Sequence, residues 1–293
     1  MSGVISRSEA GAANAPAPST APVHGRGDVS FVRDGNRSVL GRLYQKDPVR
    51  ILFPGVPVGE LPMGVLVTTS GGLVGGDVIE VSAETGAGAR AILTSQAAEK
   101  IYRSAGDDCR ISVALHAGAG SWLEWLPQET ILFDHARLRR ITSVHRAPGA
   151  SVLAGEMAVF GRTAMKETFS SGLLHDRWEV RTGDRLVWAD ALHLDDDAAD
   201  ALAHPACFDG AIAMGTVIFA CDEVDTHLDA ARALLEDAAD TVRAGASVVG
   251  GVLVVRFLSR DAFDLRAAFG DFWAGFRAHA VGLPAFLPRL WHV

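Results

Sequence analysis

The chain has 293 residues, which is enough for one large domain or two domains of ordinary size. Hydrophobic residues make up 48% of it, so a substantial core can form, and the net charge is −8. This charge argues against a nucleic-acid-binding protein or one that lies on an anionic membrane, because both need a basic surface.

The three cysteines, Cys109, Cys207 and Cys221, are far apart and form no CxxC pair. Neither a disulfide framework nor a cysteine zinc site is therefore expected, and a reducing, cytoplasmic location fits best. Residues 1–25 are rich in Ala, Gly, Ser and Pro and lack the apolar core of a signal peptide, so we expect a disordered tail. No apolar run is long enough to span a membrane. Residues 26–293 contain no linker and are expected to form a single domain.

Most of the chain from Gly27 to Leu194 shows the alternation of apolar and polar residues that is typical of β-strands. Turns rich in Gly, Pro, Asp or Asn separate the segments. The clearest expected strands are Val29–Val32, Ile51–Phe53, Ile111–Leu115, Leu138–Val144, Trp178–Arg181 and Arg185–Leu194.

A weak internal repeat runs through the middle of this region. A corner of small residues recurs around Gly86, Gly118 and Pro148, at offsets of 32 and 30 residues, and Gln96 and Gln128 are also 32 residues apart. Each copy has a strand, a small-residue corner and a second strand. Such a repeat predicts stacked β layers that approach each other closely at the corners.

The last third of the chain changes character. Helical spacing of apolar residues predicts helices over Thr226–Ala244 and Arg260–His279, with a strand over Ser247–Leu258 between them. Leu287–His292 is expected to be extended. The apolar stripe of the second helix should belong to the core, and its residues are Leu265, Phe269, Phe272, Trp273 and Phe276.

The segment Thr68–Val81 contains two glycine pairs, followed by Asp77 and an alternating run. It lacks the lysine of a P-loop, and its GGxxGG pattern is not the GxGxxG of a dinucleotide site. We expect a tight turn before a strand, with Asp77 accepting hydrogen bonds from backbone N–H groups.

Four acids stand out in the sequence. Glu156 and Asp190 lie within apolar runs, Asp77 follows the glycine pairs, and Glu129 lies in the segment LPQETILF at 126–133. Burying a carboxylate is costly unless it is paired, bonded to N–H groups, or facing water or a metal. Arginines, including Arg162 close to Glu156 in sequence, are possible partners. A structural role and a functional role remain open for each acid, and together they suggest a polar path through the interior.

The histidines form no HxH or HExxH motif, so a preformed zinc site is not expected. His193 and Asp190 are three residues apart in one expected strand and should point to opposite faces. The absence of GxSxG, and of a histidine beside any cysteine, leaves nucleophilic catalysis without local support. Asp195–Asp197 is expected to be a solvated turn.

Several motifs, in one order from Gly27 to the C-terminus, resemble the urease accessory protein UreD (UreH) family. They are GGLVGGD at 71–77, LTSQAAEKIYRS at 93–104, WLPQETILF at 125–133, GEMAVFGR at 155–162 and PRLW at 288–291. The chain departs from the family pattern at Thr69-Ser70, where two prolines are common, and in its WHV end.

The resemblance implies a mostly β, stacked, β-helix-like (solenoid-like) body with two α-helices in the C-terminal third. It also implies a non-enzymatic protein that binds apo-urease together with the accessory proteins UreF and UreG, and that passes Ni²⁺ through an internal tunnel without a tightly bound cofactor. Asp77 and Asp190 match family positions expected on the tunnel wall, and Glu156 is a third candidate for this transient nickel path.

Carboxylates spaced along a wet path suit an ion that must also leave, because weak, multi-site binding permits release. Two alternatives stay open. The chain could be a scaffold that reshapes urease without handling nickel, with every acid salt-bridged. It could also be a carbohydrate-active β-solenoid enzyme with a carboxylate pair, although its aromatic content of 7% counts against this.

Overall fold

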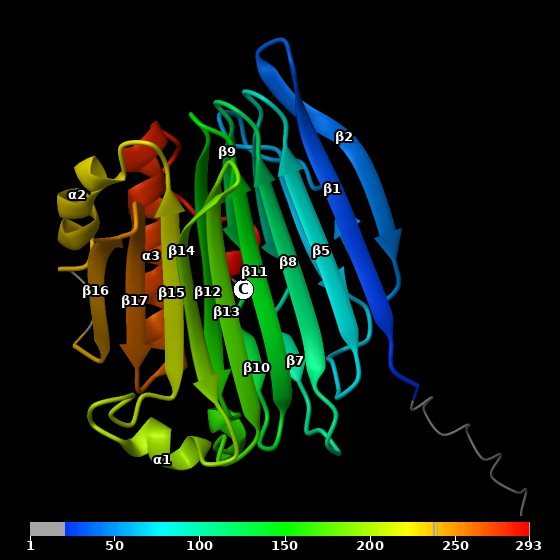
Figure 1. Cartoon of the computed structure of the whole chain (residues 1–293), viewed down its shortest axis with the longest axis vertical. Helices are drawn as coiled ribbons and strands as arrows, with labels where there is room; N and C mark the ends of the chain where they lie inside the picture. Colours follow the sequence, from blue (N-terminus) through cyan, green and yellow to red (C-terminus); the bar gives the residue numbers. More distant parts are fainter. Residues whose placement is uncertain (1–20, 237, 239, 293) are drawn as a thin grey trace, which may run out of the picture.

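The computed structural model describes residues 21–236, 238 and 240–292, and its strands form two stacked sheets (Figure 1). The first strand begins at His24, so it includes two residues of the predicted tail, whose residues 1–20 lie outside the described part. No helix in the described part of the chain is both long and apolar enough to cross a membrane.

The first sheet has seven strands, and its five central strands run parallel to one another, with an antiparallel strand at each edge. In spatial order the strands are β14 (Arg185–Leu194), β13 (Leu173–Thr182), β11 (Arg137–Arg146), β8 (Cys109–Ala117), β5 (Val78–Thr85), β1 (His24–Asp34) and β2 (Arg37–Lys46).

The second sheet has ten strands and lies behind the first in the view of Figure 1. Its main path is β16 (Val242–Val249), β17 (Val252–Ser259), β15 (Ala213–Ala220), β12 (Ser151–Phe160), β9 (Trp122–Leu126), β6 (Arg90–Ser95), β4 (Met63–Thr68) and β3 (Val49–Leu52). Off this path, β10 (Thr130–Leu132) pairs with β12 and with β7 (Glu99–Ile101).

The predicted repeat is a set of stacked coils, each with one strand in either sheet. β5 leads into β6, β8 into β9 and β11 into β12, and each turn lies at the small-residue corner. Backbone bonds tie the corners together, since Gly118 N donates to Thr85 O at 2.8 Å and Ala147 N donates to Ala117 O at 2.8 Å. The predicted mostly β, solenoid-like body is therefore confirmed.

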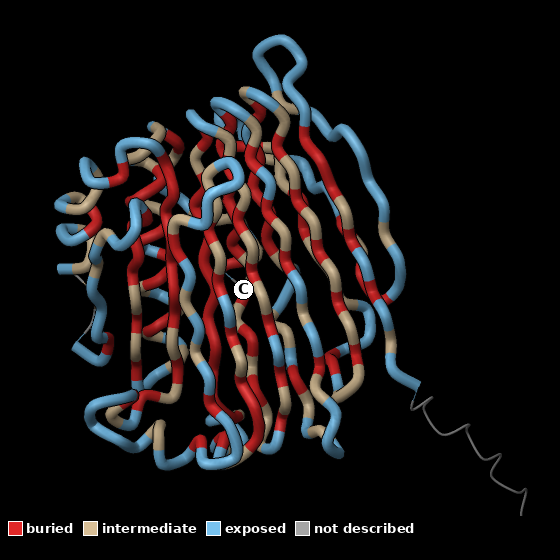
Figure 2. Tube along the Cα trace, in the orientation of Figure 1, coloured by how far each residue is buried: buried red, intermediate tan, exposed pale blue. Residues whose placement is uncertain are grey.

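Alternation along the strands decides which side chains face the other sheet. In β5 every second residue is buried, as the pattern of period two requires (Figure 2). β12 is buried at nine of its ten positions because the first sheet covers one of its faces and α3 (Ala262–Val281) lies near the other. The core thus fills two layers, one between the sheets and one beneath α3.

The helix predicted over Thr226–Ala244 is wrong in extent. A 3-10 helix, Val224–His227, and the short helix α2 (Leu228–Ala233) occupy its start, whereas β16 occupies its end. The prediction of one strand over Ser247–Leu258 is also wrong, because this segment contains the end of β16 and most of β17. Gly250 and Gly251 join these strands in a tight turn at φ of 61° and 78°, values that favour glycine.

The second predicted helix is confirmed as α3. Asp261 caps its start by accepting bonds from the Phe263 and Asp264 N–H groups at 2.8 and 3.0 Å. Its predicted apolar stripe is buried against β15 and β17. The expected extended end is instead a 3-10 helix at Arg289–Trp291, and a further helix, α1 (Ala198–Ala203), precedes β15.

Gly118→Ala should destabilise the protein by about 1–3 kcal/mol, as overpacking does elsewhere. A Cβ at this corner would lie 2.9 Å from Ala87 N and 3.0 Å from Gly86 C, which are backbone atoms of the neighbouring coil and cannot rotate away. The free energy of unfolding is measured by urea denaturation. Gly245→Ala is the control, since its Cβ would meet nothing within 4 Å; equal losses in both variants would contradict close stacking at the corner.

Candidate functional site

A cavity of about 280 Å³ lies between the two sheets, which is space for several water molecules. Apolar residues of both sheets form much of its wall, including Ile79, Val113 and Trp125. Among the described residues, its polar lining comprises Thr68, Ser95, Gln96, Glu99, Lys100, Gln128, Thr130, Arg140 and Glu156.

The cavity opens beside the turns that follow β6 and β9. Gln96, Ala97, Ala98 and Gln128 line both the cavity and an outer groove of about 980 Å³ that reaches α3 and the C-terminal segment. Gln128 Nε2 donates to Leu290 O at 3.0 Å, which holds the C-terminal segment at this opening. Three of the sequence motifs, at residues 93–104, 125–133 and 288–291, therefore meet here.

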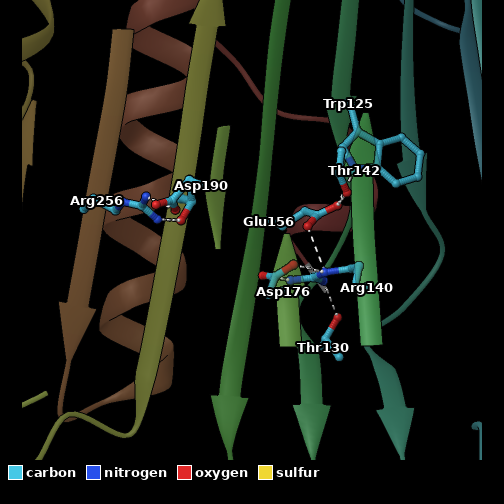
Figure 3. Close-up of polar contacts among 9 residues, drawn as sticks. Trp125, Thr130, Arg140, Thr142, Glu156, Asp176, Asp190 and Arg256 are labelled. Carbon is cyan, nitrogen blue, oxygen red and sulfur yellow. Dashed lines mark hydrogen bonds and ion pairs between the residues drawn. The ribbon is translucent and has the colours of Figure 1, made fainter. Parts of the chain in front are cut away.

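Glu156 of β12 lines the cavity and belongs to a buried ionic cluster (Figure 3). Arg140 of β11 binds both oxygens of Asp176, with Nε–Oδ1 and Nη2–Oδ2 distances of 3.0 and 2.7 Å. The same Arg140 Nε lies 2.9 Å from Glu156 Oε2. Thr142 Oγ1 and Trp125 Nε1 donate to the other oxygen, Oε1, at 2.7 and 3.1 Å.

One guanidinium therefore serves two buried carboxylates. Arg140 directs its Nε–H to Asp176, so Glu156 Oε2 is close to the cation but accepts no hydrogen bond. Burial raises the pKa of Glu156 to about 7; the nearby Arg140 cation opposes this rise and the Asp176 charge adds to it. Glu156 is thus a carboxyl group that can gain or lose a proton near neutral pH.

Glu99 of β7 is a second acid on the cavity wall. Thr68 Oγ1 donates to its Oε2 at 2.6 Å, and burial raises the pKa of Glu99. Sequence patterns did not identify Glu99 as a site residue. It follows Ala97-Ala98 and begins a strand of three residues, which is too short to show a clear alternation. The available signal was its period-two spacing from Ile101, whose side chain is fully buried.

Asp77 lies outside the cavity lining, in the turn before β5. Its Oδ2 accepts the Val74 N–H at 2.8 Å and its Oδ1 accepts the Val23 N–H at 2.9 Å. The glycines are required by close contacts, because a Cβ on Gly75 would lie 2.4 Å from Asp107 O. The predicted turn and the predicted backbone bonds of Asp77 are both confirmed.

Asp190 of β14 is the third predicted site residue, and it too lies outside the cavity lining. It pairs with Arg256 of β17, which also donates to Thr216 Oγ1 at 2.7 Å, so this pair links the first sheet to the second (Figure 3). His193 lies on the opposite face of β14, as predicted, and contacts His175. Glu129, the fourth acid singled out, pairs with Arg266 at 2.6 Å.

A second buried cluster was missed by sequence reasoning. Glu124 of β9 is fully buried and accepts from Trp122 Nε1, Trp273 Nε1 and Arg277 Nε at 2.8, 2.9 and 3.1 Å. Arg277 also binds Glu60 at 2.6 Å. The signal was an acid inside WLEWL and an arginine four residues after Trp273 on the buried face of α3.

The three predicted site residues therefore lie in three separate places, and Glu156 alone among them lines the cavity. Among the described residues, no group of three or more His, Cys, Asp or Glu side chains is arranged to hold a metal ion. The cavity instead offers the carboxyl groups of Glu99 and Glu156 together with amide and hydroxyl oxygens, beside the cations of Lys100 and Arg140.

Glu156→Gln should change how stability depends on pH. The folded state holds the Glu156 pKa at about 7, above its ordinary value of 4.5, so the folded protein keeps a proton that the unfolded chain releases. The contribution of this group is complete below the unfolded pKa and is lost as the pH rises to the folded pKa. Between about pH 4.5 and 7, the Tm of the wild type should therefore fall relative to that of Glu156→Gln.

Thermal melts across this range measure the difference. Glu84→Gln, which changes an exposed acid paired with Arg42, is the control and should follow the wild type. Parallel curves for the wild type and Glu156→Gln would show that Glu156 does not titrate in this range.

Comparisons with known proteins agree with the architecture. The model of the family described as "UreD urease accessory protein" matches residues 23–292. Urease accessory protein UreD of Magnetococcus marinus is 46% identical over 268 residues, covering 90% of this chain and 92% of that protein. UreD 2 of Methylorubrum populi is 43% identical over 249 residues (85% and 82%), and UreD of Brucella suis 38% over 273 residues (92% and 95%). The chain therefore belongs to the UreD family of urease accessory proteins.

Proposed function

We propose that this protein is a non-enzymatic urease maturation factor that binds apo-urease together with UreF and UreG and passes Ni²⁺ along its internal cavity. Nickel is the cargo, and no tightly bound cofactor is proposed. The observation that carries this proposal is the cavity between the sheets, which has Glu99 and Glu156 on its wall and an opening at Gln96 and Gln128. The cysteine pattern supports a cytoplasmic site of action.

The chemistry of the cavity suits a transient divalent ion. Ni²⁺ accepts oxygen ligands from carboxylates, amides and hydroxyl groups, and it moves on only if no single site completes its coordination. Glu156 binds a proton near neutral pH, and this proton competes with the metal and weakens its binding. The two acids thus favour brief occupation over storage.

Asp77 and Asp190 differ from the cavity acids because both lie outside the cavity lining, so they could meet nickel only beyond the cavity. A passing ion would have to displace backbone N–H groups from Asp77. At Asp190 it would have to displace Arg256 from a partly exposed ion pair. We therefore propose Glu156 and Glu99 as the inner ligands, with Asp77 and Asp190 as outer positions.

The structural partners of Asp77, Asp190 and Glu129 favour one alternative, a scaffold that reshapes urease without handling nickel. The two functions differ in their dependence on the cavity acids. A scaffold would tolerate neutral replacements at Glu99 and Glu156, whereas a conduit would not. The carbohydrate-active alternative has less support, since the chain belongs to a family of accessory proteins.

Cells that express the urease subunits and the other accessory proteins test the maturation role. With this chain omitted at a fixed nickel supply, urease activity and the nickel bound per urease should both collapse. Unchanged activity would contradict any role in urease maturation.

Replacing both cavity acids, in Glu99→Gln with Glu156→Gln, should lower the nickel bound per urease by about tenfold or more, since loss of even one charge-assisted interaction has about that effect. Nickel is measured in purified urease by mass spectrometry. Glu84→Gln is the control, because it removes an exposed acid from the outer face of the first sheet. The amount of each variant that co-purifies with urease shows whether docking is intact. Normal nickel loading by the double variant would favour the scaffold.

A further inference from the structure

Two histidines meet on the outer face of the first sheet, away from the cavity. His175 of β13 and His193 of β14 are cross-strand partners in an antiparallel pair. Their Nδ1 atoms are 3.2 Å apart, and the contact is exposed to solvent. Both residues alternate with inward-facing neighbours, among them the buried Asp176 and Leu194, so both imidazoles point away from the space between the sheets.

We propose that His175 and His193 form a surface site for one late first-row divalent metal ion, such as Cu²⁺, Zn²⁺ or Ni²⁺, with water completing its coordination. Two nitrogens 3.2 Å apart can both lie about 2.1 Å from one ion when the N–metal–N angle is about 100°. That angle lies between the square-planar and tetrahedral values. Because the χ2 torsion of histidine is broad, small ring rotations bring both lone pairs onto the ion.

Asp195 supplies a second, independent feature of metal-binding histidines. Its Oδ2 lies 3.5 Å from His193 Nε2, the ring nitrogen that does not face His175. A carboxylate at this position favours the tautomer with the hydrogen on Nε2, so His193 Nδ1 is the acceptor of the pair and His175 Nδ1 the donor. Metal binding then requires His175 to change tautomer, moving its hydrogen from Nδ1 to Nε2. Metal-ligating histidines commonly have such a partner, which also increases the basicity of the ligand.

The surrounding charges permit a cation at this position. Arg139 lies opposite His175 on β11, and Arg177 lies two residues along β13. The guanidinium groups of these arginines already bind Asp108 and Glu179, respectively. Asp108 and Glu179 thus each reduce the positive charge near the pair, although each also contacts a second arginine, and Asp195 adds a negative charge beside His193.

A second histidine pair on the same face provides an internal comparison. His116 and His145 lie opposite each other on β8 and β11, with ring centroids 5.0 Å apart and planes inclined by 17°. Since lone pairs lie in the ring plane, stacked rings direct their nitrogens along nearly parallel planes and not to a common point. This pair is therefore not expected to chelate an ion.

The site is independent of the proposed nickel path. His175 and His193 lie outside the lining of the cavity, and metal binding there requires neither urease nor another accessory protein. Loss of the surface site would leave the cavity acids in place. Failure of one proposal therefore does not imply failure of the other.

Cu²⁺ is the most sensitive probe, since it binds imidazole sites most tightly among these ions. The purified full-length chain is titrated with Cu²⁺ by calorimetry, and electron paramagnetic resonance counts the equatorial nitrogens. We expect one ion bound by two nitrogens in the wild type and loss of that site in both His175→Gln and His193→Gln. His116→Gln is the matched control and should retain it.

Asp195→Asn should weaken Cu²⁺ binding by about tenfold, as removing a carboxylate that orients a metal-ligating histidine does at other sites. Asp196→Asn removes the same charge one residue further along and should have no such effect. Zn²⁺ and Ni²⁺ should displace the bound Cu²⁺ when added in excess. Equal Cu²⁺ stoichiometry and affinity in the wild type and His193→Gln would overturn the proposal, as would loss of the site in His116→Gln.

Discussion

The interior of the β body depends on one guanidinium, that of Arg140, which two buried carboxylates share between the sheets. Glu156 comes from the second sheet and Asp176 from the first, so the cation joins the two layers as well as neutralising charge. Buried charges are tolerated only with such partners. Because one cation faces two acids, Glu156 Oε2 lacks a hydrogen bond, and Glu156 and Arg140 form part of the polar wall of the cavity.

The body of the fold was predictable because it repeats. The same pattern of alternating strand, small-residue corner and second strand occurs around Gly86, Gly118 and Pro148. An ambiguous strand in one coil can therefore be assigned from the other two coils. The region after Ala220 does not repeat, and there the predictions of a long helix and a single strand were wrong. Helical spacing continued past the true end of α2, while the Gly250-Gly251 turn was hidden inside a run that otherwise resembles one strand.

The chemistry of the site was predictable only in part, because ionic partners depend on how the layers are aligned. Arg162 is close to Glu156 in sequence, yet it binds Glu167, and the partner of Glu156 is Arg140. Periodicity gives the face of a strand but not the residue opposite it on another sheet. Asp77 was the easier case, because a carboxylate after a glycine turn has its partners in the local backbone, among them the Val74 N–H group.

The buried Glu124 cluster has a consequence for how the protein is made. The partners of Glu124 on α3, Trp273 and Arg277, lie 149 and 153 residues later in the chain. While the chain emerges from the ribosome, β9 therefore exposes Glu124 and Trp122 to water until α3 has been synthesised. The stacked coils can form in order from the N-terminus, but the layer beneath α3 forms only after α3 has left the ribosome. The polar partners of Glu124 on α3 are therefore satisfied late in folding, after the strands of the stacked coils have been made.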